Sequence, residues 1–141
     1  MLVGISIPNL SHYLTNEALR KTSREFKLLS RTAYLEAIQG FKATQIRLDP
    51  LSLTIVYKES PESALKTMQF ANGVNYEFKY WEDSRWRVPI RNDEENQQYW
   101  TFDPSGLCEP LQIRFTKDES WIELTMDPLT GNPSDEAYYL E

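Results

Sequence analysis

A single stretch with helical periodicity, residues 9–39, occupies most of the first third of the chain. Apolar side chains recur there every three or four residues, which is the spacing of a helix that buries one face. About 30 residues of helix measure about 45 Å, which is longer than most helices of globular domains. We therefore expect part of this helix to protrude from the domain or to serve as its spine.

The two ends of this helix are expected at polar or flexible residues. Asn9 or Ser11 can cap the first turn, because a side-chain oxygen accepts a hydrogen bond from a free backbone N–H. Gly40 is expected to end the helix, since glycine tolerates the left-handed conformation that follows a last turn. The face that should be buried against the rest of the chain carries Phe26, Leu29, Ala33 and Ile38.

The segment before the helix, residues 2–7, is apolar and uncharged and leads directly into Pro8. It is too short to cross a bilayer, which takes roughly 20 apolar residues. It also lacks the basic region and the small-residue cleavage site of a signal peptide. Two interpretations remain open on these grounds: the last turns of a longer apolar helix, or a buried edge strand.

From residue 41 onward the pattern changes to short alternating segments bounded by turns. Alternation of apolar and polar residues is typical of half-buried strands, which we predict at residues 44–48, 53–57, 75–81, 86–88, 99–102, 111–115 and 121–126. Asp-Pro and Gly residues predict turns at 49–52, 103–106 and 127–131, and polar composition predicts loops at 58–66 and 91–98. An amphipathic helix over 11–39 followed by antiparallel strands over 41–141 is an α+β arrangement.

Charge is distributed unevenly along the chain, which has a net charge of −6. Residues 1–91 contain 13 Lys and Arg against 9 Asp and Glu, whereas residues 92–141 contain 2 against 12. An acidic protein is poorly suited to nucleic acid, whose phosphates need clustered cations. The asymmetry would suit head-to-tail packing between copies, although a solvated acidic surface is the more common explanation.

Side chains with catalytic potential are few and scattered. His12 has no acidic or cysteine neighbour in sequence, and the single cysteine, Cys108, is interpreted as a small buried thiol. No nucleophile motif, phosphate loop or zinc motif is present. Two acidic groups could in principle bind calcium through their oxygens, but neither has the ligand register of an EF-hand. The first is Asp93, Glu94 and Glu95, and the second is Asp127, Asp135 and Glu136. We therefore predict no catalytic, cofactor or metal residues and no enzymatic activity.

The four tryptophans allow a further interpretation. Trp100 and Trp121 lie within alternating strands, where a large aromatic side chain usually fills the core. Trp81 and Trp86 flank a polar stretch and could instead form a platform for a sugar. A cleft lined by both would indicate a secreted β-sandwich that binds carbohydrate or another small ligand.

Three segments together resemble a known family. Residues 5–10, Ile-Ser-Ile-Pro-Asn-Leu, are similar to the end of the apolar N-terminal helix of type IV pilins and pseudopilins. Residues 36–40, Glu-Ala-Ile-Gln-Gly, are similar to the end of the helix in minor pseudopilins of the GspH/FimT class of type II secretion. Residues 100–106, Trp-Thr-Phe-Asp-Pro-Ser-Gly, resemble the late F-x-P-x-G segment of that class. The chain thus resembles the N-terminally truncated, soluble part of such a pseudopilin.

The resemblance implies a mechanical role. Residues 1–10 would be the remnant of a helix that anchors the subunit in the inner membrane and packs with other pseudopilin subunits in a filament. Residues 11–141 would form a pilin-like head in the periplasm, with a kink at Pro8. A prepilin peptidase site and a glutamate shortly after it are expected upstream of Leu2. The candidate assembly residues on the helix are Ile5, Ile7, Pro8, Leu10, Leu14, Arg20, Arg24 and Lys27.

A third function remains open alongside the pseudopilin and the carbohydrate-binding module, namely a DNA-uptake pilin subunit of the same fold. Its support is a basic set on the helix, formed by Arg20, Lys21, Arg24, Lys27 and Arg31. The acidic second half of the chain argues against it.

Overall fold

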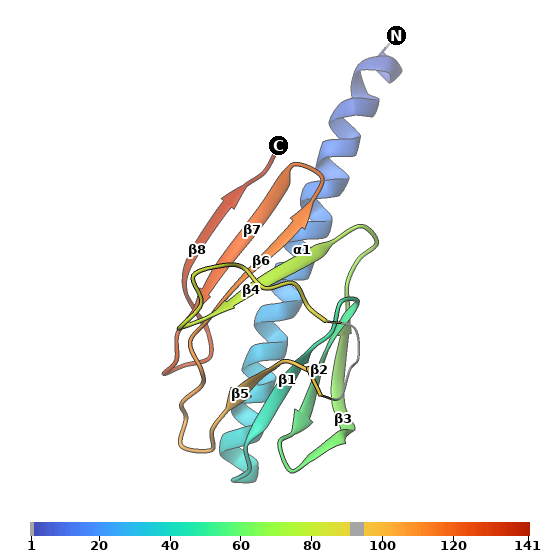
Figure 1. Ribbon diagram of the computed structural model, residues 1–141. Coiled ribbons are helices and arrows are strands. Elements are labelled where there is room, and N and C mark those ends of the chain that lie inside the picture. The colour runs from blue at the N-terminus through green and yellow to red at the C-terminus, as the bar shows by residue number, and fades with distance from the viewer. Residues whose placement is uncertain (1, 91–94) are drawn as a thin grey trace.

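The computed structural model describes residues 2–90 and 95–141, with side chains from residue 12 onward. It contains one helix and eight strands, which are α1 (Leu2–Gly40), β1 (Thr44–Leu48), β2 (Ser52–Tyr57), β3 (Ser60–Gln69), β4 (Asn75–Tyr80), β5 (Tyr99–Phe102), β6 (Leu111–Lys117), β7 (Ser120–Met126) and β8 (Pro133–Tyr139). The strands form two antiparallel sheets, ordered β3-β2-β1-β5 and β4-β6-β7-β8. Helix α1 packs against both sheets (Figure 1). The α+β arrangement expected from the sequence is confirmed.

Helix α1 begins earlier than the periodic stretch suggested. It includes the apolar residues 2–7 and continues through Pro8, for a total of 39 residues or about 58 Å. The edge-strand interpretation of this segment is therefore wrong. Caps at Asn9 and Ser11 are wrong as well, because both residues lie inside the helix. Proline can adopt the φ angle of a helix, but it has no backbone N–H to donate, so one hydrogen bond of the helix is missing at Pro8.

The C-terminal end of α1 also differs in detail from the expectation. Gly40 is the last helical residue, and the left-handed conformation falls on Phe41, whose φ is 53°. The amide of Phe41 donates a 3.4 Å hydrogen bond to the carbonyl of Ile38. The helix therefore ends one residue later than glycine chemistry predicts, with an exposed aromatic side chain in the left-handed position.

The core lies between α1 and the inner faces of the two sheets. The buried face of the helix carries Leu19, Phe26, Leu29, Ala33 and Ala37. Of the four helix residues predicted to be buried, three are confirmed, and Ile38 is half-buried. Trp100 is fully buried, as predicted. Trp121 is not, because the inward positions of β7 are Ser120, Ile122, Leu124 and Met126, which place its indole on the outer face.

The first hairpin is confirmed in position. β1 pairs with β2, with Ile46 opposite Ile55, and the turn is closed by a 3.2 Å hydrogen bond from the amide of Asp49 to the carbonyl of Ser52. The other predicted strands at 75–81, 99–102, 111–115 and 121–126 are found as β4, β5, β6 and β7, which begin or end within two residues of the predicted bounds. Residues 86–88 contribute only an isolated bridge between Phe78 and Arg87.

Two strands were not predicted. The expected loop at 58–66 is wrong, because residues Ser60–Gln69 form β3 at the edge of the first sheet, with register shifts against β2. β8 forms the edge of the second sheet beside β7. Most side chains of both strands are exposed. Because β3 and β8 have no buried face, their residues need not alternate between apolar and polar. The pattern that identifies a half-buried strand is therefore missing from both segments.

Candidate assembly surface of the helix

The N-terminal part of α1 extends beyond the head. Among the described side chains, Thr15 is the first buried residue of the helix, and its hydroxyl donates a 3.2 Å hydrogen bond to Asp118 in the β6–β7 turn. Residues 2–14 precede this contact and measure about 20 Å. Figure 1 shows this part of the helix projecting past the sheets. Leu14 is 56% exposed on it.

Besides Leu14, four of the candidate assembly residues lie on this projecting part: Ile5, Ile7, Pro8 and Leu10. The structure does not describe the side chains of these four residues. Our expectation that residues 1–10 are exposed therefore stays a prediction. The backbone places them on the same continuous helix as Leu14 and Arg20. Their role in assembly therefore stays a prediction.

A cationic row covers the exposed face of α1 where the helix lies against the head. We give this name to Arg20, Lys21, Arg24, Lys27 and Arg31. At 100° per residue, four of them, all except Lys21, fall within about 60° of arc. Nζ of Lys27 lies 3.3 Å from a carboxylate oxygen of Glu136 on β8, and Nη1 of Arg20 lies 3.5 Å from Glu17.

The remaining three cations of the row make no ion pair with any other residue in the described parts of the chain, and they are Lys21, Arg24 and Arg31. All three are exposed. The structure thus brings the candidate residues Arg20, Arg24 and Lys27 together on one surface. Only Lys27 of these three reaches an acid on another element.

An exposed leucine lies beside the cationic row on the side toward β3. Leu28 is 62% exposed and borders an open groove of about 370 Å³ between α1 and β3. Leu14 and Leu28 are 14 residues apart and point within about 40° of each other around the helix. The outer surface of α1 therefore combines apolar side chains with cations, which is a composition that suits contact with another protein.

Several acidic residues lie near the place where α1 leaves the head, and we call them the acidic collar. The sequence analysis did not predict this group. It consists of Glu17, Asp118, Glu119 and Glu141. The Thr15–Asp118 hydrogen bond holds the β6–β7 turn against the helix. The side-chain amide of Asn16 donates a 3.1 Å hydrogen bond to the carbonyl of Glu141. Glu17 lies more than 100 residues before the other three acids in the sequence, so no local pattern could have placed all four together.

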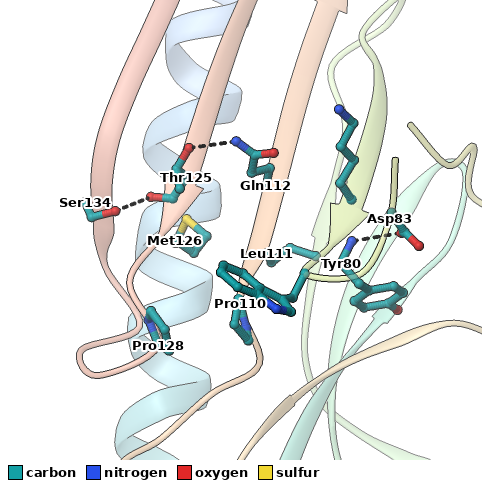
Figure 2. Close-up of a pocket in the computed structure, with 11 residues that line it drawn as sticks. Tyr80, Asp83, Pro110, Leu111, Gln112, Thr125, Met126, Pro128 and Ser134 are labelled. Carbon is teal, nitrogen blue, oxygen red and sulfur yellow. Dashed lines mark hydrogen bonds between the residues drawn. The ribbon is translucent and has the colours of Figure 1, made fainter. Parts of the chain in front are cut away.

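The tryptophans do not form the cleft that a sugar platform requires. Trp81 is 82% exposed and borders a groove of about 400 Å³ on the outer face of the second sheet (Figure 2). Within that groove Gln112 donates to Thr125 at 3.2 Å. Trp86 instead packs between two cations, with Lys79 Nζ at 4.7 Å and Arg114 Cζ at 4.5 Å from its ring centre. The indole of Trp86 is therefore engaged within the head.

Two titratable groups of the head, Cys108 and Asp83, have a pKa shifted by their surroundings. Burial raises the pKa of the Cys108 thiol to about 11, so the reactive thiolate is disfavoured at neutral pH. The guanidinium of Arg87, at 2.6 and 2.8 Å, holds the pKa of the Asp83 carboxyl below its usual range. Residues 12–90 and 95–141 contain no group of three His, Cys, Asp or Glu side chains arranged to hold a metal ion.

The acidic residues considered as calcium ligands form no metal-binding group within residues 12–90 and 95–141. Asp127 is engaged in its own turn, where its carboxylate accepts hydrogen bonds from the amide of Leu129 at 2.9 Å and the hydroxyl of Thr130 at 3.3 Å. Glu136 faces Lys27. Asp93 and Glu94 lie outside the described residues.

Within residues 2–90 and 95–141, no helix is both long enough and apolar enough to cross a membrane.

Comparisons with known proteins identify solved structures of the same fold. No protein-family model matches the chain, and no curated protein matches it by sequence. The type IV minor pilin FimU of Pseudomonas aeruginosa PAO1 matches with a TM-score of 0.61 and 13% identity over 92% of each chain. The minor pseudopilin EpsH from the type 2 secretion system of Vibrio cholerae matches with a TM-score of 0.62 and 16% identity, over 84% of this chain and 99% of EpsH. The resemblance to pilins and pseudopilins is confirmed, and the protein has the pilin-like fold of one N-terminal helix on two antiparallel sheets.

Proposed function

We propose that the protein is a non-catalytic structural subunit of a type II secretion or type IV pilus-like assembly, and that within this group it is a pseudopilin supporting protein secretion across the bacterial envelope. The proposal depends mainly on one observation, which is that helix α1 extends beyond the head (Figure 1). About 20 Å of α1 precede the first contact with a sheet that any described side chain makes. This part includes the apolar residues 2–7.

Apolar helix surface without a partner is unfavourable in water, at about 25 cal/mol for each Å² left exposed. We infer that a partner outside the head covers residues 2–7, which are apolar in sequence. A membrane and the helices of other subunits are the partners that suit an apolar helix, and the proposal places residues 1–10 among them. The head would face the periplasm, with the assembly residues of α1 between the two environments.

The two solved structures of the same fold support the proposal, because both are described as pilin-like subunits. FimU is described as a type IV minor pilin and EpsH as a minor pseudopilin of a secretion system. Both matches extend over more than four-fifths of this chain.

A photo-crosslinking experiment in the source cell tests the proposal. A photoreactive amino acid would replace Leu14 on the projecting helix, and a matched variant would carry it at the exposed loop residue Arg85. We expect the Leu14 variant to crosslink to other pilin-like subunits in the membrane fraction, and the Arg85 variant to do so much less. Fractionation of both variants away from membranes, without any subunit crosslink, would refute the proposal.

The coding sequence upstream of Leu2 offers a second test. The proposal expects a Gly-Phe-x-x-x-Glu run followed by apolar residues. A cleavable signal peptide directly before Leu2 would instead favour a secreted binding module.

A further inference from the structure

The groove on the outer face of the second sheet has no part in the proposed function. Its volume is about 400 Å³, and it crosses all four strands of the sheet, from the end of β4 to β8 (Figure 2). Sites that hold small ligands or peptide side chains start at about 300 Å³. The residues that carry the following argument are Trp81, Pro110, Gln112, Thr125 and Pro128, all of which line it.

Trp81 is the most exposed aromatic residue that lines the groove. No ring or cation in the described part of the chain stacks on its indole. The indole N–H also donates no hydrogen bond to any described residue. Tryptophan is enriched among the residues that dominate binding energies, so a free indole beside a groove is a candidate anchor for a ligand.

The backbone of Trp81 is fixed by the turn that carries it. The amide of Asp83 donates a 3.1 Å hydrogen bond to the carbonyl of Tyr80, and the amide of Tyr80 donates a 2.9 Å hydrogen bond to the carboxylate of Asp83. Arg87 binds the same carboxylate. Because the turn is closed in the free protein, binding at Trp81 orders little additional backbone.

Hydrogen-bond donors lie across the groove from this turn. Gln112 on β6 and Thr125 on β7 are directly opposite each other in register. The bond from the Gln112 amide to the Thr125 hydroxyl leaves the second amide proton and the hydroxyl proton without an acceptor among the described residues. Together with the indole N–H of Trp81, the groove therefore offers three free donors to a ligand that carries carbonyl oxygens.

The charged side chains that line the groove have partners within the head. Asp83 is bound by Arg87, and Nζ of Lys79 lies over the ring of Trp86. The remaining surface includes Pro110 and Pro128, which Figure 2 shows toward one end of the groove, with the Gln112–Thr125 pair toward the other. This combination of apolar rings and neutral donors favours an uncharged ligand with an apolar face.

We propose that the groove binds an uncharged, proline-rich peptide segment in the polyproline II conformation. Proline rings present apolar surfaces that can stack on the indole of Trp81. The backbone of such a segment makes no internal hydrogen bonds, and proline has no N–H, so its carbonyl oxygens are free for the donors of the groove. Aromatic-lined grooves recognise such segments in several other protein folds. The inference goes beyond the proposed assembly function and does not depend on it.

A sugar ring is the other ligand that could stack on Trp81. The second ring of a sugar platform, Trp86, packs between Lys79 and Arg114 and is not available. A peptide needs only the one exposed ring and the neutral donors beside it.

Titration with a short peptide, followed by NMR of the ¹⁵N-labelled protein, tests the proposal. The probe is hexaproline with acetylated and amidated ends, and the comparison peptide is a Gly-Ser hexapeptide with the same ends. We expect hexaproline to shift the Trp81 indole N–H signal saturably, with a dissociation constant below about 1 mM. The Gly-Ser peptide should bind at least about tenfold more weakly, because it has no rings to stack and a flexible backbone.

Substitutions separate the indole from the donors, with the backbone amide of Gln112 as the signal where Trp81 is replaced. W81A should raise the dissociation constant at least about tenfold. W81F keeps a ring but loses the N–H, so its effect should be smaller than that of W81A. T125V removes one donor at nearly constant shape and should weaken binding about three- to tenfold. The matched control is F41A, which removes an aromatic side chain that is 85% exposed outside the groove and should leave the dissociation constant within about twofold.

Three outcomes would overturn the inference: no saturable shift up to about 10 mM hexaproline, a W81A effect no larger than that of F41A, or saturable binding of an N-acetylglucosamine trimer at Trp81 without binding of hexaproline. Thermal midpoints of all variants check that they fold, and W81F and T125V keep the test decisive if W81A does not. The proposed assembly function is judged separately, because crosslinking through Leu14 does not involve this groove.

Discussion

Phe26 is the residue at which the helix and both sheets meet. Its ring stacks on Trp100 of the first sheet, with ring centres 5.8 Å apart. It also contacts Phe115 of the second sheet edge-on at 5.5 Å. We expect Phe26→Ala to lower the free energy of unfolding by about 3–5 kcal/mol, through lost burial and the cavity left behind. Denaturant unfolding measures this value.

The control for Phe26 lies two residues away on the same helix. Leu28 is 62% exposed, so Leu28→Ala should change the free energy of unfolding by no more than about 0.5 kcal/mol. Equal effects of the two substitutions would contradict the packing described for α1.

Gly131 shows how a single turn residue fits the head to the helix. Its φ is +67°, and an added Cβ would lie 3.2 Å from Cβ and Cδ2 of Tyr34 on α1. Gly131→Ala should therefore lower the free energy of unfolding by about 1–2 kcal/mol from backbone strain alone. Gly40→Ala is the matched comparison, since Gly40 is helical and its added Cβ meets only Tyr57 Oη at 3.6 Å.

Gly40→Ala should be neutral or stabilising by up to about 1 kcal/mol, because alanine favours the helix over glycine. A Gly131→Ala protein as stable as the parent would show that the 127–131 turn shifts freely away from Tyr34.

At the scale of elements, the edge strand β8 is held more weakly than the central strands. It pairs only with β7, and its side chains are exposed on both faces. Lys27 of α1 reaches Glu136, but a partly exposed ion pair of this kind contributes at most about 1 kcal/mol. We expect the amides of β8 to exchange with solvent faster than those of β6, which lies inside the same sheet.

Hydrogen exchange followed by mass spectrometry or NMR measures this difference. Protection in β8 equal to that in β6 in the dilute monomer would contradict the ranking of these strands. It would indicate that the free edge of β8 has a partner in solution.

At the scale of the whole molecule, the head should fold without the projecting part of α1. The first described side chain that ties the helix to a sheet is Thr15. Removal of residues 1–11 should therefore change the thermal midpoint by no more than about 2 °C. Removal through Leu19, which is fully buried, should destabilise the head strongly.

Calorimetry on the two truncated chains tests this division. A large loss on removing residues 1–11 would mean that the projecting segment packs against the head, and the basis of the proposed function would fail.

Several parts of the fold could be predicted because their residues repeat with the period of the element. The spacing of Leu19, Phe26, Leu29 and Ala33 identified the buried face of α1, and alternation identified β1, β2, β4, β6 and β7. Strands β3 and β8 escaped prediction because they bury almost nothing and carry no alternation. The sequence placed the candidate cations on one helix face, since a helix brings residues four apart together.

The features that follow from the amino-acid sequence are therefore local: one long amphipathic helix, the main hairpins and the unequal distribution of charge. Which face of each strand meets the helix depends on long-range packing, which buries Trp100 and leaves Trp121 on the outer face. Alternation of apolar and polar residues shows that the two faces of a strand differ. The element that packs against the strand decides which face becomes the inner one. The acidic collar was likewise decided by tertiary structure, because long-range contacts such as Thr15–Asp118 and Asn16–Glu141 join segments that no local period connects.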